Sequence, residues 1–251
     1  MTFSLLVRDP GTGAFGAAAA TGNLCVGAWV LRGDARAGVT ASQGLYPNPS
    51  WGPRVLELMS GGDAAEAVRQ VVGADSGRDV RQLAALDRNG RTAVHSGIGN
   101  LDYCGHIAAD DLIAVGNMLE SRAVLEAMVE AFASEPGAAR PRESGGPESG
   151  SATTGFPLAR DRAAGATSHP ELAPRLIASL AAGAAAGGDV RGLMSAAVLV
   201  VSPDAPPLDL RVDLAEDPVG ALRALYERTR EPSYQAWLSH LPTGNDPERA
   251  P

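Results

Sequence analysis

The sequence predicts an α+β protein in which two layers of helices cover two mainly antiparallel sheets. Predicted strands come in adjacent pairs joined by short turns, predicted helices also come in pairs, and the strand–helix alternation of a parallel sheet is missing. A chain of 251 residues with 45% hydrophobic residues is long enough to bury one large core. We therefore expect a single domain over residues 1–230 and a peripheral tail over 231–251.

The N-terminal segment has the pattern of a β-hairpin. Thr2–Asp9 predicts a short strand, Pro10–Gly13 has turn residues, and the small residues of Ala14–Thr21 suit a second strand under a closely packed layer. The segment Gly11–Gly16 also has the letters Gly-x-Gly-x-x-Gly of a dinucleotide-binding fingerprint. That fingerprint leads from a strand into a helix, whereas this one lies between two strands, so we interpret it as the hairpin turn.

The next segment predicts one strand and two helices. We expect the strand across Ala35–Gln43 and a first helix with Ser50 as its N-cap, ended by Gly61-Gly62. Asp63 is the expected N-cap of a second helix, because apolar residues follow it at the spacing of one helix face. These apolar residues are Ala64, Ala67, Val68 and Val71.

A second hairpin is predicted around Asn89-Gly90, because an Asn-Gly pair favours a tight turn between antiparallel strands. The strands on either side are Gln82–Asp87 and Thr92–Ser96. Apolar patterns predict further helices over residues 121–134, 172–186 and 217–228, and further strands over 195–201 and 208–213.

The segment from Glu135 to His169 differs in composition from its surroundings. It is dense in Gly, Pro, Ser, Ala and Arg and almost lacks large apolar residues. Such a segment cannot bury enough apolar surface to offset its ordering entropy. We expect a flexible surface insertion at about 135–169.

Composition also excludes several classes of function. The formal net charge of −8 argues against a nucleic-acid partner, which needs clustered cationic contacts. The chain contains no lysine, which excludes Schiff-base enzymes, P-loop lysines and lysine general bases. An apolar run long enough for a membrane span and a signal peptide are both missing, so we expect a cytoplasmic protein without a membrane partner.

Common catalytic motifs are missing as well: there is no Gly-x-Ser-x-Gly elbow, His-Glu-x-x-His pair or P-loop. Cys25 and Cys104 are interpreted as buried thiols in preference to a disulfide or a nucleophile. His95 and His106 could meet if they lie on neighbouring strands, but no carboxylate pattern accompanies them, so each is more readily a core or site-lining residue than a ligand. We expect neither a metal nor another cofactor.

Thr2 is the remaining candidate nucleophile. Removal of Met1 would combine its hydroxyl with a free α-amine, whose pKa of about 8 makes it a usable base near neutral pH. On residue type alone the alternative is a generic N-terminal strand.

A series of short motifs along the chain points to one family. In order, they are Thr2-Phe3-Ser4, Arg8-Asp9-Pro10, Thr12-Gly13, Ser42-Gln43, Asn48-Pro49, Gly52-Pro53-Arg54, His95-Ser96-Gly97, Gly105-His106, Gly116-Asn117-Met118-Leu119, Ala186-Gly187-Gly188-Asp189, Arg191-Gly192, Ser195-Ala196-Ala197, Asp209-Leu210-Arg211-Val212-Asp213 and Asp217-Pro218. On these motifs the chain resembles the N-terminal-nucleophile (Ntn) hydrolase-like family called domain of unknown function 1028, over about residues 2–134 and 171–228.

The resemblance implies a four-layer αββα sandwich and an amidohydrolase that acts on a small amide or peptide-like substrate. Thr2 would be the nucleophile with its α-amine as base, and a backbone N–H together with the Asn117 amide would bind the oxyanion. Gln43, Asn48 and His95 would line the substrate pocket. The resemblance also implies a homodimer.

The chain departs from the family pattern at Asn100, Tyr103 and Met194, where the family often carries cysteine, tryptophan and glutamine, so the resemblance does not name the substrate. Two other functions remain open at this point. One is a non-catalytic binding or assembly protein on the same fold. The other is a metal-dependent hydrolase that uses His95 and His106.

Overall fold

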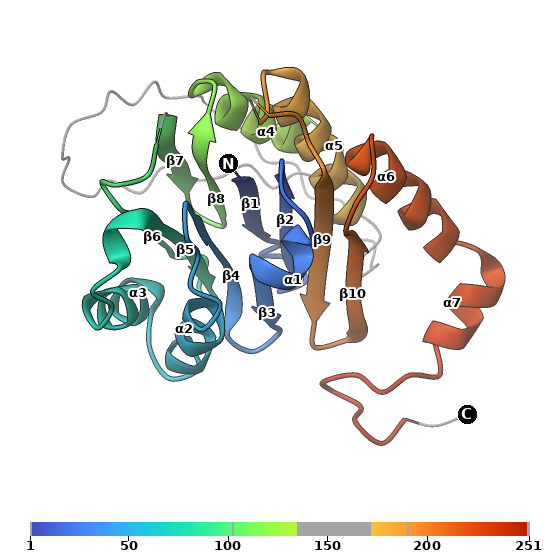
Figure 1. The fold of residues 1–251 in the computed structure, drawn as a ribbon. Coiled ribbons are helices and arrows are strands. Elements are labelled where there is room, and N and C mark those ends of the chain that lie inside the picture. Colours follow the sequence, from blue (N-terminus) through green and yellow to red (C-terminus); the bar gives the residue numbers. More distant parts are fainter. Residues whose placement is uncertain (1, 102, 135–171, 190, 250–251) are drawn as a thin grey trace.

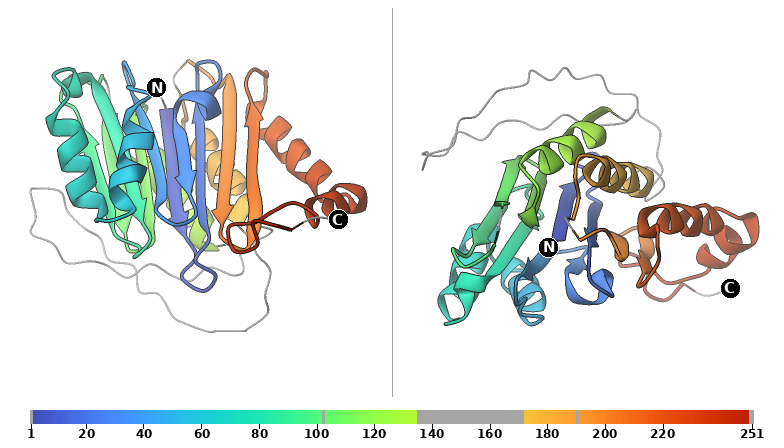
Figure 2. Two further views of the ribbon diagram at one scale, coloured as in Figure 1. Left: turned by 90° about the horizontal axis from the view of Figure 1, so that it is seen from below. Right: turned by 45° about the horizontal axis from the view of Figure 1, so that its top comes forward.

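The computed structural model describes residues 2–101, 103–134, 172–189 and 191–249. It is an α+β sandwich, as the sequence predicts: two antiparallel sheets lie face to face, with α4, α5 and α6 outside the larger sheet and α2 and α3 outside the smaller one (Figures 1 and 2). The expected insertion at 135–169 lies outside the described residues. No helix among the described ranges is long and apolar enough to cross a bilayer.

The larger sheet, sheet A, has the strand order β10-β9-β2-β1-β8-β7, and the smaller, sheet B, has the order β3-β4-β5-β6. Every neighbouring pair in these orders is antiparallel. Sheet A consists of β1 (Thr2–Arg8), β2 (Phe15–Thr21), β7 (Tyr103–Ala109), β8 (Leu112–Leu119), β9 (Ser195–Ser202) and β10 (Ala205–Val212), and sheet B of β3 (Leu31–Asp34), β4 (Gly38–Gly44), β5 (Arg81–Asp87) and β6 (Thr92–Ser96).

The helices that the sequence predicts, α2 to α6, begin and end close to the expected positions. Asp63 caps α3 by accepting the N–H of Glu66, and Asp217 caps α6 in the same way through Gly220. The tail forms a short helix, α7, in which no residue is buried. The helices are α1 (Val26–Trp29), α2 (Trp51–Met59), α3 (Ala64–Gly73), α4 (Ala123–Ser134), α5 (Leu172–Ala185), α6 (Pro218–Thr229) and α7 (Pro232–Leu238), with a 3₁₀ turn η1 (Arg78–Val80) before β5.

Alternation along β1 divides the core between two layers. Phe3, Leu5 and Val7 pack with α4, α5 and α6, whereas Leu6 packs in the apolar layer between the two sheets. Because successive side chains of a strand point to opposite faces, Thr2 and Ser4 share the inter-sheet face with Leu6. The first residue of β1 therefore directs its side chain between the sheets.

Three expectations need correction, and some elements were not predicted. The strand expected across Ala35–Gln43 is wrong at its start, because Asp34 accepts the N–H groups of Arg36 and Ala37 and turns the chain between β3 and β4. Ser50 precedes α2 as expected, but its side chain makes no capping hydrogen bond. The short helix α1 and the β7–β8 hairpin were not predicted. Cys25 and Cys104 are free thiols that are half-buried instead of fully buried.

Gly38 starts β4 with φ +140°, and a Cβ atom there would lie 2.1 Å from the carbonyl oxygen of Leu86 on β5. We expect Gly38→Ala to lower the free energy of unfolding by about 1–3 kcal/mol, because backbone strain adds to the steric clash. Gly73→Ala is the matched control, since nothing lies within 4 Å of its added Cβ. Urea denaturation measures both, and equal stability of the two variants would contradict the expectation.

Candidate functional site

Four polar residues form a row across sheet A at the end where β1 begins. Thr2 lies directly opposite Thr21 on β2 and opposite Asn117 on β8. Thr21 in turn pairs with Ser195 on β9. Directly opposed residues share a face, so all four side chains point toward sheet B. Strands β2, β8 and β9, which lie far apart along the chain, therefore each place one polar residue in the row that contains Thr2.

A second polar row crosses sheet B and faces the first. Gln43 on β4 pairs with Gln82 on β5, which pairs with Ser96 on β6. Gln43 and Gln82 are 1% and 0% exposed, so their amides need partners inside the protein. The two rows provide those partners for each other.

Gln43 joins sheet B to the first strand. Its Nε2 donates to the carbonyl oxygen of Thr2 at 3.1 Å, and its Oε1 accepts the hydroxyl of Ser4 at 2.6 Å. The same Nε2 donates to Oε1 of Gln82 at 2.9 Å. The backbone of Thr2 is thus held from across the inter-sheet space.

Gln82 is the centre of the network. Its Oε1 accepts from both Gln43 and Asn117, the latter at 3.1 Å. Its Nε2 lies 2.9 Å from the carbonyl oxygen of Gly116 and 2.9 Å from the hydroxyl of Ser96. One buried amide therefore ties β4, β5 and β6 to β8.

The hydroxyl of Thr2 lies 3.1 Å from the hydroxyl of Thr21, and either oxygen can donate. Thr2 is only 7% exposed. The polar partners described for Thr2 are the hydroxyl of Thr21 and the side-chain amide of Gln43, and neither carries a charge. The side chains described in contact with Thr2 are thus a hydroxyl and an amide, both uncharged.

Asn117 carries an unusual acceptor. Its Nδ2 donates to Gln82, but its Oδ1 is buried without a hydrogen-bond partner among the described residues. An unpaired buried acceptor costs about 1–3 kcal/mol, so such atoms are rare and often mark functional positions. Asn117 lies directly opposite Thr2, which places this acceptor at the start of β1.

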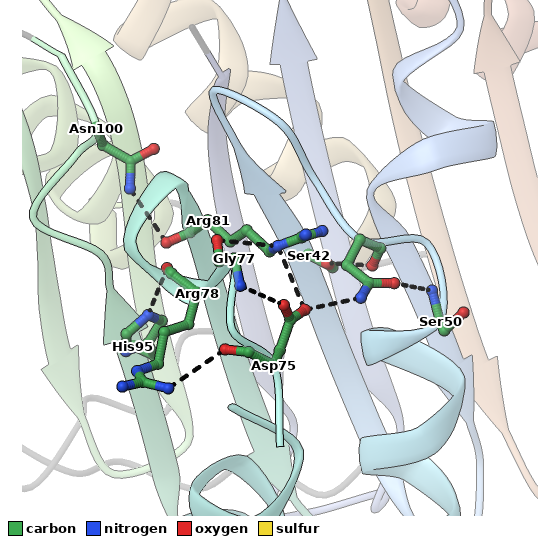
Figure 3. A network of polar contacts seen from close by, with 9 residues as sticks. Ser42, Ser50, Asp75, Gly77, Arg78, Arg81, His95 and Asn100 are labelled. Carbon is green, nitrogen blue, oxygen red and sulfur yellow. Dashed lines mark hydrogen bonds and ion pairs between the residues drawn. The ribbon is translucent and has the colours of Figure 1, made fainter. Parts of the chain in front are cut away.

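Asn48 lies outside this network, contrary to the expectation that it lines the pocket with Gln43. Its Nδ2 donates to Asp75 at 2.9 Å, and its Oδ1 accepts the N–H of Ser50 at 3.0 Å. Asp75 also accepts the N–H of Gly77 and contacts Arg81, as Figure 3 shows. Asn48 therefore holds the loop before α2 against the connection between α3 and β5.

His95, expected in the same pocket, also lies away from Thr2, on the face of sheet B that α2 and α3 cover. It pairs with Leu83, which packs under α2 and α3, so its ring points away from sheet A. The ring meets Trp51 edge-on at 5.9 Å between ring centroids. Its Nε2 lies 3.0 Å from the carbonyl oxygen of Arg78, a contact that Figure 3 shows.

The structure does not bring the two candidate metal ligands together. His106 pairs with Val115, which faces the inter-sheet core, whereas His95 faces the helices outside sheet B. Among the described residues, no group of three or more His, Cys, Asp or Glu side chains could hold a metal ion. Burial raises the pKa of the Cys104 thiol, which opposes a thiolate at neutral pH.

Two hollows open on the surface away from Thr2, each of about 450 Å³. One lies between α5 and α6 and includes Asp217 and Arg223, and the other lies between α2 and α3 and includes Asn48 and Trp51. Neither includes a residue of the two polar rows.

The chain is similar to one family model and to a solved structure. The model described as Family of unknown function (DUF1028) matches residues 2–222. A crystal structure of a protein from Silicibacter pomeroyi, described with the same family, is 41% identical in sequence, has a TM-score of 0.81 and covers 99% of this chain and 98% of its own. No curated protein matches the chain significantly.

Replacing Gln82 tests whether the amide network holds the sheets together. Gln82→Met keeps the length of the side chain but leaves Asn117 Nδ2 and one bond of Gln43 Nε2 without an acceptor, so we expect a loss of about 1–3 kcal/mol in the free energy of unfolding. Gln70→Met on α3, where the amide contacts only Glu66 among the described partners, should change it by less than about 0.5 kcal/mol. Chemical denaturation that gave both variants equal stability would contradict the central position of Gln82.

Proposed function

The chain belongs to the family of unknown function DUF1028, as its motifs predict, and we propose that it is an Ntn amidohydrolase whose nucleophile is the Thr2 hydroxyl. The position of Thr2 carries this proposal. It is the first residue of a central strand, and its hydroxyl points into a polar row between two sheets. Removal of Met1 would place an α-amine on the same residue as that hydroxyl.

In the proposed reaction, the α-amine takes the proton of the Thr2 hydroxyl as its oxygen attacks the amide carbonyl. The C–N bond then breaks, the leaving amine receives the proton, and water hydrolyses the resulting ester of Thr2. No lysine or histidine is needed, which agrees with a lysine-free chain and with a histidine on the far face of sheet B.

Asn117 fits two parts of this reaction. Its Oδ1, which lacks a partner among the described residues, would accept an N–H of the α-amine and orient its lone pair toward the hydroxyl. Its Nδ2 uses one hydrogen on Gln82, and the second would stabilise the oxyanion with a backbone N–H. Loss of one such donor typically costs a factor of about 10² to 10³ in rate.

The chemistry of the site favours a small, uncharged amide or peptide-like group at the point of cleavage. The side chains that contact Thr2 and Gln82 are hydroxyls, amides and a thiol, and none of them balances a charge. Gln43 remains in the proposed site as the residue that holds the Thr2 backbone. We also propose a homodimer, which light scattering of the purified protein can test.

One observation favours a non-catalytic binding or assembly function instead. Thr2 is 7% exposed, and the two surface hollows lie away from it. A protein that merely kept the fold would need no access to this residue. Processing and covalent chemistry at Thr2 separate the two functions.

The direct test is a screen of small amides, lactams, γ-glutamyl compounds and N-acyl amino acids, with intact-mass detection of an acyl adduct on Thr2. We expect Thr2→Ala to abolish adduct formation and turnover, because it deletes the nucleophile while keeping a small residue after Met1. Thr2→Ser should retain part of the activity.

Thr12→Ala is a matched control, because Thr12 lies in the exposed β1–β2 turn. An uncleaved N-terminal extension should silence the enzyme as fully as Thr2→Ala, since an amide nitrogen is not a base. Normal turnover by the extended protein, with its mass confirmed, would refute the mechanism. Retention of Met1 on the native protein would favour the non-catalytic function.

A further inference from the structure

A buried carboxylate lies beside the start of β1. Asp189 is in the connection from α5 to β9, which runs at the same end of sheet A as the N-terminus (Figures 1 and 2). Its side chain is 0% exposed. The proposed reaction has so far assigned it no part.

The register of the sheet shows where Asp189 lies. Thr2 is opposite Asn117, and β8 continues past Asn117 through Met118, whose φ is +58°, to Leu119. Leu119 pairs with Tyr103 of β7 on one side, and Asp189 forms a bridge with Leu119. A strand residue has two sides, so Asp189 lies on the side of Leu119 away from β7, which is the side on which β1 pairs with β8.

The other neighbour of β1 also contacts Asp189. The N–H of Gly22, the residue after Thr21, donates to its Oδ2 at 2.6 Å. A Cβ at Gly22 would lie 2.5 Å from that oxygen, so the glycine allows the carboxylate to approach the backbone. Asp189 thus closes the gap between β2 and β8 directly beyond Thr2.

We propose that Asp189 is a positioning residue that holds and partly charges the α-amine of Thr2 after Met1 is removed. This inference rests on the proposed function. A carboxylate near an amine favours its protonated form and so raises the pKa of the amine. The neutral amine then accepts a proton more strongly, although a smaller fraction of it is neutral at pH 7. A hydrogen-bonded carboxylate would also fix the direction of the amine toward the Thr2 hydroxyl.

The charges around this position favour an ionised Asp189. Burial alone would raise its pKa, but hydrogen bonds from the Arg191 side chain and from the backbone N–H groups of Arg191 and Gly22 lower the pKa below its ordinary value. Arg191 donates to both carboxylate oxygens, at 3.0 Å and 2.9 Å. Two other titratable side chains lie in this region. Glu120 lies against Gly187, two residues before Asp189, and Cys104 contacts Gln82 and has a raised pKa, which favours the neutral thiol.

The reactivity of the α-amine gives a readout that does not depend on turnover. Because the chain has no lysine, this amine is its sole primary amine, and acetic anhydride at pH 7 labels it without competition from side-chain amines. Only the neutral amine reacts. Asp189→Asn keeps an acceptor for Gly22 but removes the charge, so we expect labelling about threefold faster or more, which is a fall of about half a pKa unit.

Two further variants control the test. Arg191→Ala removes the positive charge that offsets Asp189. The carboxylate should then raise the pKa of the α-amine further, so we expect slower labelling, opposite to the effect of Asp189→Asn. Asp87→Asn changes a second fully buried carboxylate that is paired with an arginine, Arg91, and should leave the rate unchanged because it lies on β5. Urea denaturation of each variant shows whether a change in rate accompanies loss of folding.

The outcomes separate this inference from the proposed function. Faster labelling of Asp189→Asn and slower labelling of Arg191→Ala support the inference. Unchanged rates in both folded variants, or changes in the same direction, would overturn it and leave Thr2 as nucleophile untouched. If Asp189→Asn does not fold, the slowing in Arg191→Ala decides alone. Retained Met1 on the native protein would instead overturn the proposed function.

Discussion

The hydrogen bonds of one buried amide, that of Gln82, join the two sheets at the end where β1 begins. Elsewhere the sheets meet through apolar side chains, which pack without a required direction. At the Thr2 end they meet through donors and acceptors that must match, because an unmatched group is costly in a low-dielectric interior. The position of Thr2 between the sheets therefore depends on residues contributed by β4, β5 and β8.

Part of this arrangement could be predicted from the sequence. A hairpin with strands at 2–8 and 15–21 pairs its end residues, so Thr21 opposite Thr2 follows from the turn alone. A two-residue Asn89-Gly90 turn would place Gly97 opposite Gln82, whereas the observed loop of residues 88–90 places Ser96 there. The contact between Gln43 and Gln82 could not be predicted, because two helices separate their strands along the chain. The face of sheet B to which His95 points could not be predicted either, because it depends on which face of that sheet α2 and α3 cover.

The unpredicted elements have physical reasons as well. Residues 112–119 are buried almost throughout, so they lack the alternation that identifies a half-buried strand. The helix α1 has a single turn, and the residue before it, Cys25, has a left-handed backbone conformation. No local sequence pattern predicts either feature. Long helices with one apolar face, such as α3, were predicted well because local spacing and tertiary packing agree.

The amides and hydroxyls of the two polar rows determine how the charge at this end of the protein depends on pH. Asparagine, glutamine, serine and threonine do not titrate between acid and alkaline pH, so these rows keep the same charge in every compartment. In the proposed function, removal of Met1 adds an α-amine to the Thr2 row, beside the carboxylate of Asp189. Removal of Met1 would thus act as a maturation step that gives a row of uncharged side chains a pH-dependent group of its own.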